Sequence, residues 1–337
     1  CGGTRASLGD EVVVVGCWVA KTRNAVRKMM FPKYFRGLMA LMLMVGGHAA
    51  AQAQVRYDLA SWGEDVKAAK WETGVAVAGV TALGLTSWDW GSSKSFKWNP
   101  EGWFGKDTGS GGADKLGHAF TSYALTNVLA NRLLREGRSP ERAALSAAIT
   151  TQAIILYVEV FDGLSNDHGF AREDVVMNLL GTGLAYVRTV NPKVRDLVDF
   201  RMEYQESGYK GYRPFSDYSG QKYLAALKLG GFNALRNTPF QYLELQAGYY
   251  TRGFSKGEQA NGLARSRHSF IGVGLNLSAL LFGNRTNDEA ALKNAGRLFF
   301  DHIQIPHTAA RASLDFLAGR NSICWTVGWT SSKANAY

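Results

Sequence analysis

The spacing of apolar side chains changes near Asp196, and this change limits the folds open to the chain. Between Asp114 and Val190 apolar residues recur about every 3.6 residues, the period of a helix with one buried face. Farther along, Ile271 and Val273 alternate with glycines, the period of a strand. The chain is therefore predicted to be an α+β protein, with an N-terminal helical bundle followed by an antiparallel β-meander.

The helical part has clear start and stop signals. Ser139 and Pro140 are residue types that cap a helix and occupy its first turn, Gly137 separates this helix from the one before it, and Asn191-Pro192 stops the last one. An earlier apolar run of small residues also predicts a helix. The main predicted helices cover residues 114–136, 139–162 and 172–190, and the small-residue helix covers 73–88.

The strand-rich part, residues 197–316, contains about six candidate strands. They are residues 200–205, 221–232, 243–249, 271–281, 298–305 and 309–316. Two arrangements suit this pattern, because a sheet packed on helices and a partial transmembrane barrel both alternate apolar and polar faces. The tail, residues 317–337, shows no strand pattern.

Residues 29–53 have the pattern of a secretory signal peptide. Lys33 and Arg36 precede an apolar run, GLMALMLMVGG, which is too short to cross a bilayer, and Ala51-Gln52-Ala53 is a cleavage pattern. Residues 1–28 are interpreted as an upstream extension. We therefore expect an exported protein of the periplasm or outer membrane of a Gram-negative bacterium.

Charge and motif content exclude several functions. The net charge of +10 includes seven Lys/Arg and two acidic residues of the first 53, so about half of the excess disappears with that stretch. No basic stripe interleaved with aromatic residues is present, which argues against nucleic acid as a partner. The chain has no P-loop, nucleophile elbow or CxxC motif.

Three polar motifs interrupt the apolar helices. Asp114 and His118 stand at i and i+4, Glu159 and Asp162 end the next helix, and Asp174 is followed four residues later by an asparagine. Carboxylates gain nothing from the helix dipole at a C-terminal end, so Glu159 and Asp162 need another compensating group.

These motifs are similar to those of a known family. D-K-L-G-H (114–118), E-V-F-D-G (159–163) and D-x-x-x-N-x-x-G (174–181) resemble the YfiM-like predicted periplasmic lipoproteins, domain-of-unknown-function family 2279, over about residues 57–200. A more distant resemblance is to the VanZ-like membrane proteins. Neither resemblance implies a particular reaction, and the A-Q-A site in place of a lipobox cysteine departs from the lipoprotein pattern.

The polar motifs support two interpretations. Oxygen and imidazole donors suit a divalent metal such as Mn, Zn or Mg, with Asp114, His118, Glu159, Asp162 and Asp174 as ligands. His118, Glu159 and Asp174 are then the catalytic candidates of a metal-dependent hydrolase or transferase acting on a lipid or cell-wall intermediate, with Lys115 or the metal stabilising charge. The other interpretation is a structural polar network that also includes Lys115, Asn178 and Gly181.

The sequence favours the second interpretation over an enzyme. Buried polar groups on packed helices commonly satisfy one another and fix helix register without catalysing anything. We therefore predict an envelope protein with a structural or lipid-associated role at the periplasmic face of the outer membrane. Membrane lipid or the outer-membrane surface is the expected partner.

Overall fold

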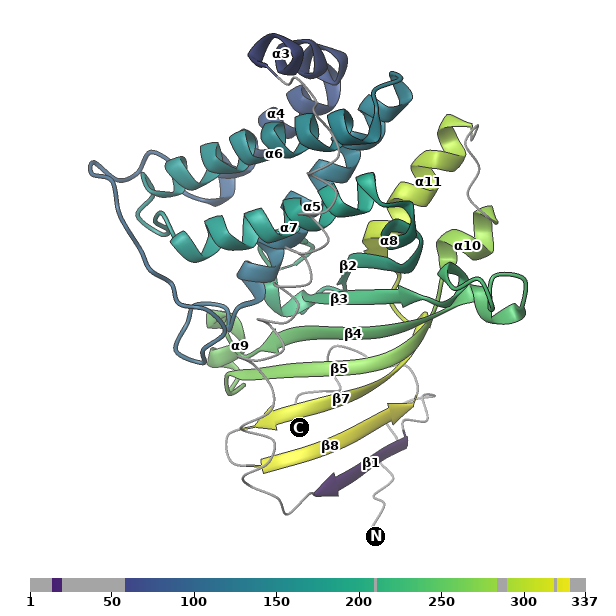
Figure 1. The fold of residues 1–337 in the computed structure, drawn as a ribbon. Helices are drawn as coiled ribbons and strands as arrows, with labels where there is room; N and C mark the ends of the chain where they lie inside the picture. Colours follow the sequence, from purple (N-terminus) through teal and green to yellow (C-terminus); the bar gives the residue numbers. More distant parts are fainter. Residues whose placement is uncertain (1–13, 20–57, 209–210, 284–289, 318–319, 328–337) are drawn as a thin grey trace. The chain divides into compact units, whose positions relative to one another are not determined.

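The computed structural model describes residues 14–19, 58–208, 211–283, 290–317 and 320–327 (Figure 1). The predicted signal peptide at residues 29–53, and most of the predicted extension and tail, lie outside these residues. The chain forms two compact units. Of the described residues, the helical unit contains 58–103 and 115–195, and the sheet unit contains 14–19, 104–114 and those between 196 and 327.

The helices begin and end where their capping residues require. Ser139 accepts a hydrogen bond from the Arg142 backbone N–H, and Pro140 opens the helix behind it. Gly137 adopts a φ of 78°, which suits glycine, just after the preceding helix ends. The three main predicted helices are confirmed. The helices are α3 (Leu59–Ala68), α4 (Lys70–Ser87), α5 (Ala113–Arg135), α6 (Pro140–Asp162), α7 (Arg172–Val190) and the short α8 (Pro192–Leu197).

Small side chains and one ion cluster hold the helical unit together. Leu129 and Leu133 of α5 pack with alanines of α3 and α6, a combination that allows close helix contact. Asp65 of α3 is buried and accepts hydrogen bonds at 2.8 Å from both Arg138 and Arg142. This carboxylate therefore ties α3 to the start of α6.

Several apolar side chains of the helical unit face outward. On α4, Trp71, Val75 and Leu85 are each about 70% exposed. Among the residues that the structure describes, only α6 is long and apolar enough to cross a membrane by length and composition, and half of its apolar window is buried. Exposed apolar residues on this scale are typical of an interaction surface.

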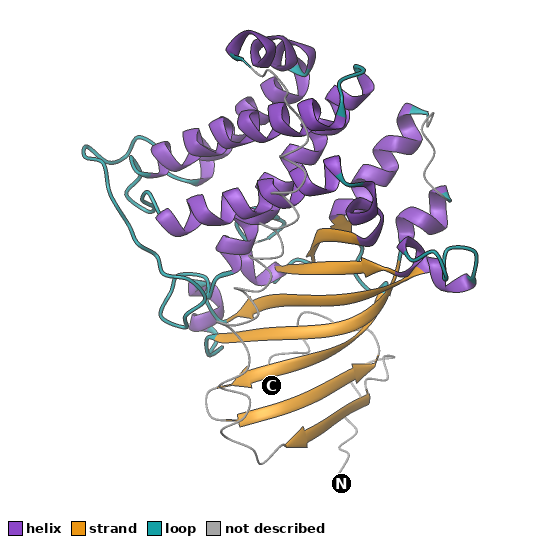
Figure 2. Ribbon diagram, in the orientation of Figure 1, coloured by secondary structure: helices purple, strands orange, loops and turns teal. Residues whose placement is uncertain are grey.

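The sheet contains eight described strands in the order β1-β8-β7-β5-β4-β3-β2-β6 (Figure 2). The predicted α+β class is confirmed. The sheet is mixed, however, because β6 pairs with β2 in parallel while the other neighbours are antiparallel. The strands are β1 (Val14–Val19), β2 (Val198–Tyr204), β3 (Gln221–Lys228), β4 (Leu243–Arg252), β5 (Ser266–Leu275), β6 (Ile303–Gln304), β7 (Ala309–Leu317) and β8 (Arg320–Val327).

One predicted strand is half helix, and another is mostly helix. The alternation in 271–281 ends at Leu275, because the Asn276 side chain accepts a hydrogen bond from Ala279 N–H and starts α10 (Leu277–Phe282). Most of 298–305 belongs to α11 (Ala291–His302), and only the two residues of β6 are strand. A short apolar run fits either period, so the pattern alone did not separate the two. Strands β8 and β1 occupy stretches where no strand was predicted.

The two faces of the sheet differ in burial. One face buries ion pairs together with an apolar cluster of Leu224, Ala226, Tyr250 and Phe270, and the other face exposes apolar side chains. On one face, Arg201 is 2% exposed and donates hydrogen bonds to Asp199 at 2.6 Å and to Glu244 at 2.9 Å. On the other face, Ile271 and Val273 of β5 are 52% and 46% exposed. Charged groups are normally buried only when they are paired, and these groups are paired.

A second ion cluster on the charged face has similar chemistry. The Glu203 carboxylate forms two ion pairs. Its Oε1 lies 3.1 Å from Lys222 Nζ, and its Oε2 lies 2.7 Å from Arg311 Nη2. Burial alone raises the pKa of Glu203, but the two cations outweigh burial and lower it. The charged face therefore carries buried ion pairs that run across β2, β3, β4 and β7.

Candidate functional site

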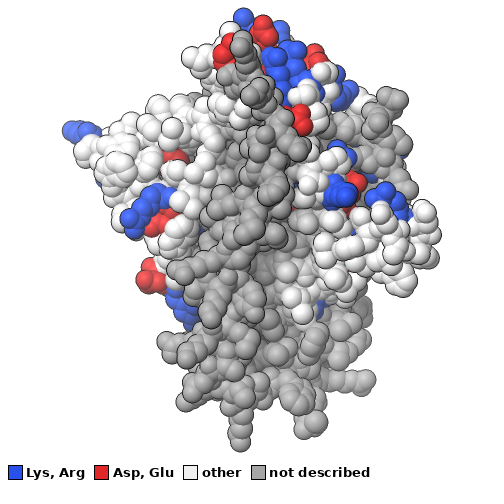
Figure 3. All heavy atoms as spheres, in the orientation of Figure 1, with Lys and Arg blue, Asp and Glu red and all other residues white. Residues whose placement is uncertain are grey.

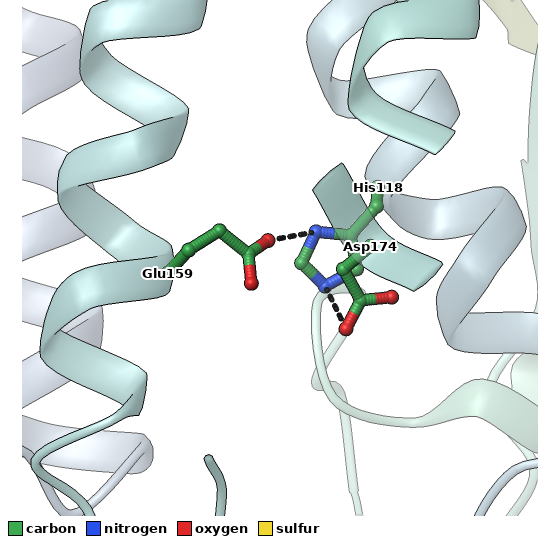
Figure 4. A group of neighbouring side chains, drawn as sticks. All are labelled: His118, Glu159 and Asp174. Carbon is green, nitrogen blue, oxygen red and sulfur yellow. Dashed lines mark ion pairs between the residues drawn. The ribbon is translucent and has the colours of Figure 1, made fainter. Parts of the chain in front are cut away.

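Polar side chains from three helices meet inside the helical unit. His118 of α5 lies between Glu159 of α6 and Asp174 of α7 (Figure 4). Its Nδ1 is 3.2 Å from Glu159 Oε1, and its Nε2 is 3.7 Å from Asp174 Oδ2. Both carboxylates are buried, whereas the His118 side chain is 24% exposed. The cluster of His118, Glu159 and Asp174 therefore reaches solvent through the imidazole.

A second layer of hydrogen bonds fixes Glu159. The Asn178 amide donates to Glu159 Oε1 at 3.0 Å, and the Ser122 hydroxyl donates to Asn178 Oδ1 at 3.0 Å. Gln152 in turn donates to the backbone oxygen of Asn178 at 3.1 Å. Because the partners of Glu159 are themselves held, its carboxylate is positioned before any ligand arrives.

Lys115 supplies a buried positive charge beside this cluster. Its side chain is 1% exposed, and its Nζ lies 2.8 Å from Asp174 Oδ1 and 2.5 Å from Glu101 Oε2. A buried ammonium group is tolerated only next to opposite charge. Lys115 therefore holds the carboxylates of Asp174 and Glu101 in place.

The remaining two predicted metal ligands have other surroundings. Asp162 accepts a hydrogen bond from the Trp90 indole at 2.6 Å. Burial raises the pKa of the Asp162 carboxyl, and the bond from Trp90 only partly opposes this shift. Asp114 belongs to the sheet unit, where it accepts a hydrogen bond from the Ser110 hydroxyl. Of the five predicted metal ligands, the structure brings three together within the helical unit. That they bind a metal stays a prediction.

The cluster combines an imidazole with two carboxylates, which are ligand types that divalent metals accept. One donor atom from each of His118, Glu159 and Asp174 lies within 4.8 Å of the others. Two ligands of one ion can be at most about 4.2 Å apart, so a small side-chain rotation would let these three bind Zn or a similar metal.

Gly181 allows α5 and α7 to approach each other. A Cβ atom built at this position would lie 1.9 Å from the backbone oxygen of Ala119. Gly183, two residues farther on and exposed, has no neighbour within 4 Å of such an atom. Gly181, which was predicted as a member of a structural polar network, therefore allows close contact between the two helix backbones.

This geometry predicts opposite effects for two alanine substitutions. Gly181→Ala is expected to lower the free energy of unfolding by about 1–3 kcal/mol, because the helix backbones must move apart. Gly183→Ala is expected to raise it by roughly 0.5–1 kcal/mol, because alanine favours the helix. Urea unfolding of the two variants beside the wild type measures both values. Equal effects at the two positions would contradict the close contact.

Three residues of the site were not predicted. Ser122 follows His118 by four residues, so helical spacing alone would have placed it on the same face. Gln152 lies in an uncharged stretch of α6 and carried no such signal. Glu101 lies in a loop rich in glycine and tryptophan, where no periodic pattern indicates which side chains turn inward.

The described residues form an α+β protein with a buried polar site between three helices. Residues 100–190, which contain all three motifs, match the family described as "Predicted periplasmic lipoprotein (DUF2279)". This match confirms the predicted family resemblance, over a shorter range than the expected 57–200. No curated protein and no solved structure matches the chain.

The family description agrees with the predicted export to the periplasm. It names a domain of unknown function and gives no ligand or reaction. The distant resemblance to VanZ-like proteins stays a prediction.

Proposed function

We propose that this is a lipid-associated protein at the periplasmic face of the outer membrane of a Gram-negative cell. The observation that carries the proposal is the exposed apolar face of the sheet. Leu245, Ile271, Val273 and Leu275 are 40–52% exposed on one face, while the opposite face buries ion pairs such as Arg201 with Glu244. Strands that meet hydrocarbon expose apolar side chains on the lipid side, as this face of the sheet does.

The helical unit supports the same proposal independently. Its α4 carries no charged residue after Glu72 and exposes Trp71, Val75 and Leu85. Lys, Arg and acidic side chains gather instead over the α3 end of this unit (Figure 3). Apolar helix surface beside a charged end is typical of segments that lie against a membrane.

Flotation of the full chain with phospholipid vesicles tests the proposal. The protein is expected to rise with the vesicles in a density gradient and to remain bound in high salt, because the contact is apolar rather than ionic. Recovery of all the folded protein at the bottom of the gradient would overturn the proposed lipid association.

A metal-dependent hydrolase or transferase is a second candidate, and the convergence of His118, Glu159 and Asp174 favours it. His118 with either Glu159 or Asp174 would hold a divalent cation, which would supply Lewis-acid chemistry there. The remaining carboxylate would accept a proton from the attacking water and pass it to the leaving oxygen of the acyl or phosphoryl group. Lys115 would stabilise the negative charge that develops there.

Elemental analysis of the purified full chain tests this candidate. Near-stoichiometric divalent metal is expected in the wild type and in His168→Ala, whose histidine lies in the turn before α7. The His118→Ala and Asp174→Ala variants are expected to lose the metal while keeping their helical circular dichroism. A folded wild-type protein without metal after incubation with Zn, Mn or Mg would reject the metal site and leave a structural network.

A further inference from the structure

Three aromatic side chains form a partly exposed cluster at one end of the helical unit. The rings of Phe96, Trp98 and Phe170 have centroids 4.9–5.9 Å apart. Trp98 is 73% exposed and Phe96 is 41% exposed. Exposed aromatic side chains that gather in one place are typical of an interaction surface. We call these three residues the aromatic cluster.

Backbone hydrogen bonds fix the aromatic cluster to the turn between α6 and α7. The Lys97 N–H donates to the Gly163 oxygen at 2.8 Å, and the Phe170 N–H donates to the Lys97 oxygen at 2.9 Å. The Asn99 N–H donates to the Phe170 oxygen at 3.0 Å, so Trp98 stands between two anchored residues. Little conformational entropy is therefore lost when a partner covers the Trp98 ring.

Exposed apolar side chains also occur on the three helix ends beside this cluster. Leu85 in the last turn of α4, Val160 in the last turn of α6 and Val176 near the start of α7 are 39–67% exposed. The end of α4 is held here because the Trp90 indole donates to Asp162 of α6 at 2.6 Å. We call the aromatic cluster and these three exposed residues together the apolar end.

The opposite end of the helical unit is charged. Helix α6 begins there, and its 23 residues span about 35 Å to the turn that carries the aromatic cluster. Lys67 and Lys70 at the junction of α3 and α4 are exposed, as is Arg135 at the end of α5. Arg132 donates to the Ala68 oxygen at 3.2 Å, which joins the end of α5 to the end of α3. Desolvation of such charges is costly, so this charged end stays in water.

The polar neighbours of the aromatic cluster suit the headgroup layer of a bilayer. Lys94, Asp167 and Arg172 are exposed and carry both signs of charge, as the headgroups of zwitterionic phospholipids do. Tryptophan is enriched at this layer, because its ring is apolar and its indole N–H bonds to water or to headgroups. One apolar end and one charged end also match the lipid side and the water side of a membrane surface.

We propose that the apolar end is a membrane anchor of the helical unit, in which the Trp98 ring lies among the upper acyl chains of a phospholipid bilayer. The charged end then points into water. The proposal rests on the proposed lipid association and adds a contact surface in the helical unit. It is separate from the exposed face of the sheet, because all of its residues belong to the helical unit.

Flotation of the full chain with phosphatidylcholine vesicles tests this anchor. Trp98→Glu is expected to bind on the order of tenfold more weakly than the wild type, because it removes an apolar contact and brings a charge to the lipid. Trp98→Tyr keeps an aromatic ring with a polar group and is expected to bind about as well as the wild type. The control Arg135→Glu reverses an exposed charge at the charged end and is expected to float as the wild type does.

Vesicles brominated in the upper acyl chains report where Trp98 lies, because bromine quenches tryptophan fluorescence on contact. The wild type is expected to lose a larger share of its fluorescence than Trp98→Tyr, which lacks this one indole. Equal shares in the two chains would put Trp98 outside the acyl chains and overturn the anchor.

The outcomes separate this anchor from the general proposal. A folded Trp98→Glu chain that floats as well as the wild type would reject the anchor and leave lipid association at the sheet face standing. Equal losses in Trp98→Glu and Arg135→Glu would reject the proposed orientation of the helical unit. A wild-type chain that stays at the bottom of the gradient would overturn both proposals.

Discussion

Replacing Arg201 by methionine is expected to lower the free energy of unfolding by about 3–5 kcal/mol. Methionine keeps much of the side-chain volume, so the loss comes from the charge. Asp199 and Glu244 would then remain buried without the guanidinium that now lies 2.6 and 2.9 Å away. Although burial alone lowers the pKa of Arg201, these carboxylates outweigh it and raise the pKa, as expected for a tightly held ion.

Two further variants make this measurement decisive. Arg213→Met removes an exposed arginine of the same unit and is expected to change the free energy of unfolding by less than about 0.5 kcal/mol. Adding Glu244→Gln to Arg201→Met removes one of the two buried carboxylates that have lost the guanidinium. This double variant is expected to regain part of the lost free energy of unfolding. Urea unfolding followed by tryptophan fluorescence gives all three values. A loss below about 1 kcal/mol in Arg201→Met would contradict a buried ion network in the sheet.

The helical part was predictable because its signals are local. Ser139 and Pro140 start α6 through contacts within one turn, and Asn191 ends α7 in the same way. The predicted and observed bounds of α7, Arg172–Val190, coincide. Capping and proline geometry depend on neighbours in the sequence, so they do not change with the contacts that distant parts of the chain make.

The ends of the sheet were not predictable because they depend on distant contacts. The parallel pairing of β6 with β2 joins Ile303 to Met202. No local pattern in the Phe299–Ile303 stretch signals that partner. The apolar residues there fit a helix and a strand equally well, and the long helix α11 takes most of them.

The candidate site was partly predictable. The i, i+4 spacing of polar residues on apolar helices indicated His118 and Asp174 as inward-facing side chains, and the structure brings them to Glu159. Which further carboxylate would join them depends on how the helices are rotated. Asp162 is one turn from Glu159, and it contacts Trp90 instead. Rotations of this kind are set by packing, for example at Gly181, and spacing does not reveal them.

The second large effect is expected on membrane binding. Ile271→Glu is expected to weaken vesicle binding by on the order of tenfold, since it removes apolar contact area and brings a charge to the lipid side. Because the Ile271 side chain is 52% exposed, folding should be nearly unchanged. Ala260→Glu adds the same charge at an exposed position after β4 and is expected to bind as wild type.

Flotation of the wild type, Ile271→Glu and Ala260→Glu chains with phospholipid vesicles in one gradient tests the central claim most directly. Any lipid affinity of the N-terminal segment is the same in all three chains, so differences report the sheet face. The account predicts that the wild type and Ala260→Glu float while Ile271→Glu largely stays behind. Equal flotation of all three, with the Ile271→Glu chain folded, would contradict a lipid contact at this face.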